Sequence, residues 1–289
     1  AVARQVLSAC GDAPFGMGTD CYFTELNRER PATTDADFVS YSMNPQVHAF
    51  DDASLMETLE AQAVTVDSAR AFANGMPITV SPVTLRPRFN PNATGDPAEA
   101  ASDELPFEVD PRQMSLFTAA WTLGSVASLA SAGAEGATYY EPTGLRGVMD
   151  ASALENVPRD FARVEGGVYP AYHVLRDVCA FAGGHTRRSE VSDTLAISAL
   201  ALQSESQHAV WVANLTLKER TVRIEGLAPG RHAVRTLDVT NATRAMLDPE
   251  AYRDDIAYMD IKQGATVLAL GAYGVARIGS CATEPSHLA

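Results

Sequence analysis

Residues 37–62, DFVSYSMNPQVHAFDDASLMETLEAQ, join a strand-like run to a helix-like run and determine the fold of the first half of the chain. The run ADFVSYSMNPQVHAF predicts a buried strand that ends in polar side chains. Ser54, with Glu57 three residues later, predicts a capping box at the start of a helix. Apolar residues then follow at helical spacing, at Leu55, Leu59, Ala63 and Val66. The stretch therefore predicts one strand–helix unit.

The same alternation extends over the first half of the chain. Three further strands are predicted in GMGTDCYFTELN (16–27), MPITVSPVTLRPRF (76–89) and EGATYYEPTG (135–144). Asp110, Pro111 and Gln113 predict the capped start of a helix that runs to near Gly133. Residues 1–8 predict a helix ahead of the first strand, and the long polar loop after residue 89 is typical of a functional lid or a mobile segment. Strands alternating with helices predict a parallel sheet.

The second half of the chain has a different pattern. Short strands are predicted in AISALALQ, HAVWVANLTL, RTVRIEGL, RHAVRTLDVT, YMDIKQ and ATVLALGAYGVARIG. Their spacing predicts an antiparallel all-β sandwich, preceded by a linking helix in residues 166–184. We expect the boundary near Thr186, which gives a partial barrel domain at 1–185 and a sandwich domain at 186–289.

Four strand–helix units are half of a (β/α)8 TIM barrel, which typically takes about 250 residues. About 160 residues of this chain have the α/β pattern, and the pattern starts on a helix. We therefore expect an α/β fold consisting of the second half of a TIM barrel, strands five to eight, followed by the sandwich. The missing N-terminal half of the barrel, or a partner subunit, would complete it.

Composition narrows the classes of partner. The net charge of −14 and pI near 4.8 argue against nucleic acid or an anionic membrane as partner. No apolar run reaches the length of a membrane span. The four cysteines lack zinc-binding spacing and are too few for a disulfide framework, which indicates a reducing, cytoplasmic compartment. No cofactor is predicted.

Polar side chains follow each predicted strand. In parallel α/β folds the active site lies at the carboxyl ends of the strands. The side chains at these positions are Glu25 and Asn27, then Asn44, Gln46 and His48, then Arg86 and Arg88, and finally Tyr139, Tyr140 and Glu141. Four polar strand ends in register predict a site for a small polyhydroxylated or carboxylated molecule.

Several motifs together identify a family. FTELNRERP, NPQVHAFDD, SPVTLRPRFNPNATG, DPRQMSLFTAAWTLGS and ATYYEPTG resemble D-apionate lactonase, and the likeness continues through AVWVANLT and LALGAYGVARI. The resemblance implies opening of the lactone of a branched sugar acid, D-apionolactone, in bacterial apiose catabolism. It also implies a longer protein, with the first barrel strands upstream.

The roles of individual residues follow from lactone chemistry. Hydrolysis needs a base for water, donors for the oxyanion and an acid for the leaving alkoxide. We expect His48, Glu25 and Glu141 to be catalytic, and a sugar acid or lactone to be bound by Asn27, Asn44, Gln46, Arg86, Arg88 and Tyr140. The three catalytic candidates each have a structural alternative: His48 hydrogen-bonded under a loop, and Glu25 or Glu141 in an ion pair with Arg86 or Arg88. A divalent metal held by Glu25, His48 and Glu141 is a further alternative.

Two other functions remain open. The layout is also similar to retaining glycoside hydrolases, which use two carboxylates about 5 Å apart. In that superfamily the nucleophile is a glutamate that would follow the third strand of this chain. This chain has Arg86 and Arg88 there instead. The alternatives are therefore a glycoside hydrolase with an atypical carboxylate pair and an inactive carbohydrate-binding barrel.

Overall fold

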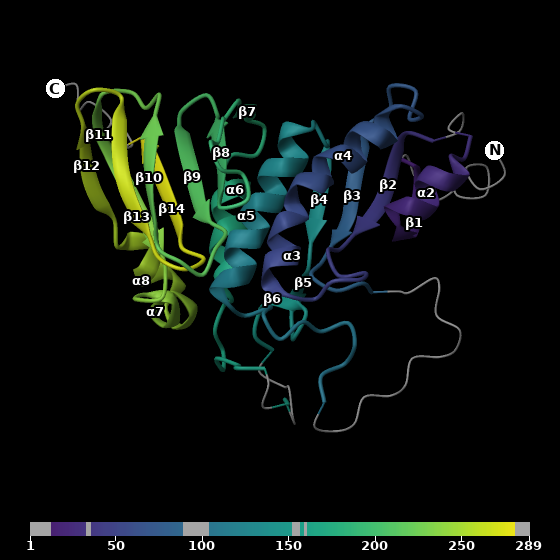
Figure 1. The fold of residues 1–289 in the computed structure, drawn as a ribbon, viewed down its shortest axis with the longest axis horizontal. Coiled ribbons are helices and arrows are strands. Elements are labelled where there is room, and N and C mark those ends of the chain that lie inside the picture. Colours follow the sequence, from purple (N-terminus) through teal and green to yellow (C-terminus); the bar gives the residue numbers. More distant parts are fainter. Residues whose placement is uncertain (1–12, 33–35, 89–103, 152–156, 159–160, 281–289) are drawn as a thin grey trace. The chain divides into compact units, whose positions relative to one another are not determined.

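A computed structural model describes residues 13–32, 36–88, 104–151, 157–158 and 161–280 of the chain (Figure 1). The chain divides into two compact units. The α/β unit contains residues 1–110 and 128–141, and the β-rich unit contains residues 111–127 and 142–289. The predicted helix at 1–8, most of the predicted lid, Cys10 and Cys281 lie outside the described residues.

The α/β unit is built on one parallel sheet in the order β1-β2-β3-β4 (Figure 1). Its strands are β1 (Gly16–Tyr22), β2 (Phe38–Met43), β3 (Ile78–Val83) and β4 (Gly136–Tyr139). The helices between them along the chain are α2 (Phe23–Glu29), α3 (Asp52–Glu57), α4 (Leu59–Arg70) and α5 (Leu116–Ser131). Of α5, only residues 128–131 are counted in this unit. The parallel sheet predicted from the alternation is confirmed.

The core of this unit explains why these residues form these elements. Alternate residues of β2 point into the core, so that Val39 and Tyr41 are fully buried. The Tyr41 hydroxyl lies 2.8 Å from the Thr65 hydroxyl on α4, which satisfies both groups. The β1 and β2 backbones approach closely at Gly18, where a Cβ atom would overlap the Ser40 carbonyl oxygen. Only glycine fits at that position.

The first two strands end earlier than predicted. β1 ends at Tyr22 and α2 begins at once, so Glu25 and Asn27 lie on a helix rather than at a strand exit. β2 ends at Met43, and Asn44 Oδ1 accepts a hydrogen bond from the Gln46 backbone N–H at 3.1 Å. This local turn, together with the missing N–H of Pro45, ends the ladder. The prediction of one strand face carrying Asn44, Gln46 and His48 was wrong.

The third and fourth strands are also shorter than predicted. β3 ends at Val83, and residues 84–88, including Arg86 and Arg88, form a loop. β4 ends at Tyr139 because Tyr140 adopts a left-handed backbone with φ of 57°. Glu141 then opens a short strand, β5 (Glu141–Thr143), which pairs with β6 (Gly147–Met149) in a separate sheet.

Both predicted helix caps differ in the structure. The N-cap of α3 is Asp51, whose side chain accepts from the Ser54 N–H at 3.0 Å, so Ser54 is not the cap. Asp110 does not cap α5, because that helix begins at Leu116. The capping patterns were recognised from side-chain spacing, and spacing does not show which acceptor reaches the first turn.

The β-rich unit contains two packed antiparallel sheets, as the sequence predicts. The larger has the order β12-β11-β14-β9-β8-β7, and the smaller pairs β10 with β13. Its strands are β7 (His185–Arg187), β8 (Ile197–Gln203), β9 (His208–Asn214), β10 (Arg220–Glu225), β11 (Gly230–Leu237), β12 (Ala257–Ile261), β13 (Ala265–Leu270) and β14 (Val275–Ser280). Val212, Val234 and Ile278 of the larger sheet pack with Ile224 and Leu270 of the smaller one in a shared core.

Helices complete the β-rich unit. α6 (Pro170–Cys179) lies within the predicted linking helix. α7 (Ala242–Leu247) and α8 (Pro249–Asp254) were not predicted. None of the helices among the described residues is both long enough and apolar enough to span a membrane. Cys21 and Cys179 are free thiols. The domain boundary near Thr186 stays a prediction.

Candidate functional site

The residues that follow β2, β3 and β4 meet at the carboxyl edge of the parallel sheet. Two backbone hydrogen bonds extend the pairing beyond the strands: the Thr84 N–H donates to the Met43 carbonyl at 3.0 Å, and the Tyr140 N–H donates to the Val83 carbonyl at 3.2 Å. Polar side chains placed after neighbouring parallel strands therefore lie close together, as in the active sites of parallel α/β folds.

An arginine–glutamate pair joins the ends of β3 and β4. Arg88 Nη1 lies 2.7 Å from Glu141 Oε1, and the side chains are 28% and 30% exposed. Tyr140, between β4 and Glu141, is buried, and its ring centroid lies 5.9 Å from that of Tyr139. The pair combines a carboxylate and a guanidinium that are both within reach of solvent. This arrangement suits proton transfer next to a positive charge.

A second carboxylate, Asp110, was missed as a site residue. Its side chain is 1% exposed, and its Oδ2 accepts a hydrogen bond from Gln46 Nε2 at 2.5 Å. The same Oδ2 lies 3.5 Å from Arg86 Nε. Gln46 also donates to the Leu85 carbonyl at 2.7 Å. The sequence carries no signal for this cluster, because Asp110 before a proline has the appearance of a helix cap.

The remaining predicted residues either contact residues close to them in the sequence or are exposed. Glu25 pairs with Arg28 at 3.0 Å and Asn27 Oδ1 accepts from Arg30, both within or next to α2. Asn44 closes its own turn, and His48 is exposed. The structure brings together Gln46, Arg86, Arg88, Tyr140 and Glu141 at the carboxyl edge. For Glu25 and Asn27 it gives local partners, Arg28 within α2 and Arg30 directly after it.

A metal site is not formed by the predicted alternative ligands. Within the described part of the chain, no group of three or more His, Cys, Asp or Glu side chains is arranged to hold a metal ion. Glu25, His48 and Glu141 are therefore not gathered into such a group.

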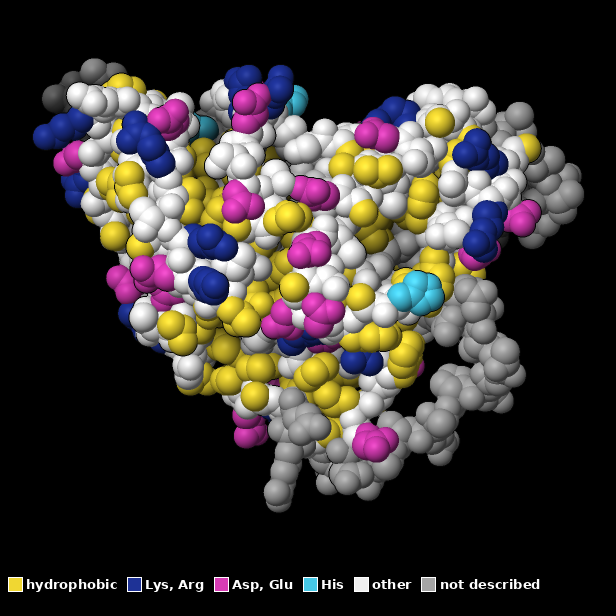
Figure 2. Space-filling model, viewed as in Figure 1, with side chains coloured by type: hydrophobic (Ala, Val, Ile, Leu, Met, Phe, Trp, Pro, Cys, Tyr) yellow, Lys and Arg dark blue, Asp and Glu magenta, His cyan; other side chains and the backbone are white. Residues whose placement is uncertain are grey.

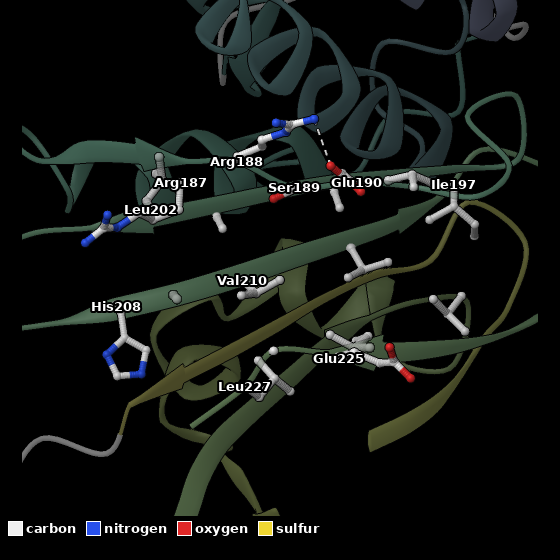
Figure 3. A pocket seen from close by; sticks show the side chains of 18 of the residues that line it. Arg187, Arg188, Ser189, Glu190, Ile197, Leu202, His208, Val210, Glu225 and Leu227 are labelled. Carbon is white, nitrogen blue, oxygen red and sulfur yellow. Dashed lines mark ion pairs between the residues drawn. The ribbon is translucent and has the colours of Figure 1, made fainter. Parts of the chain in front are cut away.

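A cavity lies elsewhere, in the β-rich unit. It has a volume of about 960 Å³, and its lining includes Val210 and Val212 of β9 and Ile224 of β10 (Figure 3). At its rim, Arg188 and Glu190 form an exposed ion pair at 2.8 Å. None of the predicted site residues lines it. Because its lining lacks buried polar groups that converge on one point, we place the candidate site at the sheet edge instead.

The surface charge is mixed. Figure 2 shows acidic and basic side chains interspersed with neutral ones on the visible face, despite the net charge of −14. A surface of this kind offers no continuous basic patch on that face for a polyanion.

Comparison with known proteins identifies the family. Residues 1–183 match the model of the D-apionate lactonase TIM barrel domain, and residues 195–278 match that of the D-apionate lactonase C-terminal immunoglobulin-like domain. A D-apionate lactonase of Brucella anthropi is 30% identical over 222 residues, which are 76% of this chain and 35% of that protein. The chain thus spans about a third of the length of this curated relative.

Solved structures support the fold. An α-L-arabinofuranosidase from Bifidobacterium longum matches 97% of this chain and 61% of its own, with a TM-score of 0.57 and 13% identity. A 4-O-α-L-rhamnosyl-β-D-glucuronidase from Fusarium oxysporum matches 89% of this chain and 56% of its own, with a TM-score of 0.57 and 13% identity. The fold is a TIM-barrel domain followed by an immunoglobulin-like domain, and the chain belongs to the D-apionate lactonase family.

Proposed function

We propose that the protein hydrolyses a sugar-acid lactone, opening D-apionolactone to D-apionate in apiose catabolism. Family membership supports the reaction class, and the observation that carries the proposal is the Arg88–Glu141 pair at the carboxyl edge of the sheet. A carboxylate and a guanidinium side by side supply a proton acceptor and an oxyanion donor, which lactone hydrolysis requires.

In this proposal Glu141 accepts a proton from a water molecule whose oxygen bonds to the lactone carbonyl carbon. Arg88 donates hydrogen bonds to the oxyanion that forms on the carbonyl oxygen. The bond from the carbonyl carbon to the ring oxygen then breaks, and the protonated Glu141 gives its proton to the departing alkoxide. Alternatively, a protonated His48 supplies that proton, and Glu141 releases its own to solvent, from which His48 is protonated again. Glu25 remains a second candidate for the base.

The other predicted residues would bind the substrate. Gln46, Arg86 and Tyr140 follow β2, β3 and β4 at the same edge of the sheet as the pair. Asn27 and Asn44 would hydrogen-bond to hydroxyl groups of the substrate. We further propose that β1 to β4 are strands five to eight of the barrel, with the remaining strands supplied by an N-terminal half or a partner subunit. We also propose that the protein is cytoplasmic and that it binds neither nucleic acid nor a membrane.

The test is lactone opening by the purified protein, followed by acid release at constant pH and by mass spectrometry of the product. We expect Glu141→Gln and Arg88→Gln to lower kcat at least about a hundredfold, the range for loss of a general base or oxyanion donor. The matched control is Glu250→Gln, which removes a glutamate from the exposed Arg176–Glu250 pair.

Three results decide among the alternatives. Wild-type rates in Glu141→Gln and Arg88→Gln would refute the assigned roles. Release of sugar from an aryl glycoside without action on lactones would indicate a glycoside hydrolase. Binding of D-apionate without turnover of any lactone or glycoside would indicate a carbohydrate-binding barrel.

A further inference from the structure

Arg86 lies near two half-exposed phenylalanine rings at the carboxyl edge of the sheet. Its guanidinium carbon is 5.9 Å from the ring centroid of Phe50 and 5.9 Å from that of Phe107. Phe50 is 50% exposed and Phe107 is 48% exposed. A cation beside aromatic rings within about 6 Å is attracted by them. The three side chains therefore form one surface that is both cationic and apolar.

The orientation of Arg86 is set by polar partners beneath this surface. Arg86 Nη1 donates to the Phe107 backbone carbonyl at 3.3 Å, and Nε lies 3.5 Å from Asp110 Oδ2. The same Asp110 oxygen accepts the hydrogen bond of Gln46 at 2.5 Å. The buried carboxylate thus ties together the segments that follow β2 and β3. A guanidinium fixed in this way loses little freedom when it binds a ligand.

Few large hydrophobic side chains are exposed in the described part of the α/β unit, and two of them belong to this surface. Four large hydrophobic side chains are exposed among the described residues of the α/β unit, namely Val47, Phe50, Val64 and Phe107. Val64 lies on α4, whereas the other three lie in the segments that follow β2 and precede α5. Single exposed apolar residues need no explanation, but Phe50 and Phe107 both lie near the fixed Arg86 cation, and such a group marks a binding surface.

We propose that Phe50, Arg86 and Phe107 form the subsite that holds the sugar-acid ligand, with Asp110 as the residue that positions Arg86. This inference rests on the proposed function and adds residues that contact the ligand without taking part in proton transfer. The guanidinium recognises the carboxylate of the sugar acid or the carbonyl of its lactone. The phenylalanine rings cover the carbon skeleton. Their contribution to binding is the same for an uncharged analogue, because it does not depend on the carboxylate.

The first experiment measures binding rather than activity. The protein is titrated calorimetrically with D-apionate and with D-apiitol, the uncharged polyol of the same skeleton. Arg86→Ala should weaken D-apionate binding at least about tenfold, as expected for loss of a charge-assisted hydrogen bond. The same variant should leave D-apiitol binding within about twofold, whereas Phe50→Ala and Phe107→Ala should weaken both ligands.

The chain offers a matched control. Arg231 lies over the exposed Tyr258 ring at 4.2 Å, an arginine–aromatic pair in the β-rich unit. Arg231→Ala and Tyr258→Ala make comparable changes away from the proposed subsite. Both should bind D-apionate as the wild type does.

The positioning role of Asp110 is tested by a double-mutant cycle. Asp110→Asn keeps an acceptor for Gln46 but removes the charge beside Arg86. It should raise KM for the lactone with little change in kcat, and Arg86→Ala should have almost no added effect on D-apionate binding in that background. Additive effects would show that Asp110 is merely structural. Circular dichroism confirms that each variant is folded.

The outcomes separate this inference from the proposed function. Arg86-dependent binding of D-apionate without lactone turnover refutes hydrolysis and supports the subsite. Normal turnover combined with D-apionate binding that is indifferent to Arg86, Phe50 and Phe107 refutes the subsite alone. Absence of D-apionate binding by the wild type at about 10 mM, where even a very weak complex would form, also overturns it.

Discussion

Replacing Asp177 by asparagine should strongly destabilise the β-rich unit. Asp177 lies on α6 with its side chain 10% exposed and faces arginines from three other elements. Its Oδ2 accepts a hydrogen bond from Arg235 of β11 and lies 4.0 Å from Arg277 Nε of β14. Its Oδ1 lies 3.0 Å from Arg253 Nη1 of α8. One carboxylate therefore pairs with three guanidiniums and offsets part of their positive charge.

The strand register explains why this carboxylate matters. Arg235 pairs directly with Arg277 across β11 and β14, and Arg277 pairs with Trp211 of β9. Like charges opposite each other in a sheet destabilise it. Without the carboxylate, burial further disfavours these charges, and burial already lowers the pKa of Arg277. Asp177→Asn removes the negative charge and so increases the excess of positive charge in the cluster.

The expected cost is about 3–5 kcal/mol, the range measured when one partner of a buried ion pair is removed. The lower part of that range applies because Arg253 and Arg277 remain about a quarter exposed. At about 2–4 °C per kcal/mol for a domain of this size, the unfolding midpoint should fall by on the order of 10 °C.

Urea unfolding followed by tryptophan fluorescence measures the loss, since the Arg277 guanidinium lies 5.5 Å from the Trp211 ring centroid. The control is Asp255→Asn, which breaks the exposed Arg244–Asp255 pair and should cost less than about 1 kcal/mol. Adding Arg253→Gln to Asp177→Asn should recover part of the stability. If Asp177→Asn and Asp255→Asn cost the same, the charge argument is wrong.

Three further predictions concern stability. Burial lowers the pKa of His173 to about 4. The imidazole therefore stays neutral in the native state, whereas in the unfolded state it takes up a proton below about pH 6.5. The free energy of unfolding should be highest above pH 6.5 and fall by about 3 kcal/mol towards pH 4. Urea titrations at several pH values should show that this slope is reduced in His173→Gln, which retains a donor for the Ala245 carbonyl. Gly18→Ala should cost about 1–3 kcal/mol, because the Ser40 carbonyl must move; a midpoint equal to that of Gly75→Ala, whose added Cβ meets no neighbour but whose φ is positive, would contradict this. Asn214→Ala should cost on the order of 3 kcal/mol by thermal or urea unfolding, because its buried amide donates to the carbonyls of Lys218, Leu270 and Gly271; an unchanged midpoint would refute that role.

The order and type of most elements could be predicted from the sequence. Alternating apolar residues in β2 and the helical spacing of Leu55, Leu59 and Val66 indicate which residues are buried. This signal is present in the sequence because hydrophobicity is a property of each side chain. The parallel sheet followed from the alternation of elements. The strand ends did not, because Asn44 and Tyr140 stop their strands through a local turn and a left-handed backbone.

The candidate site shows the same division. The residue types at the strand exits, arginine and glutamate above all, were evident from the sequence, because chemistry belongs to the side chain. Their pairing was not: Arg88 meets Glu141 across 53 residues, and Gln46 meets Asp110 across 64. Contacts between residues so far apart in the sequence form only when the folded sheet brings together the segments after its strands and the segment before α5. The sequence by itself determined which chemical groups were available, and the tertiary structure alone decided which of them meet.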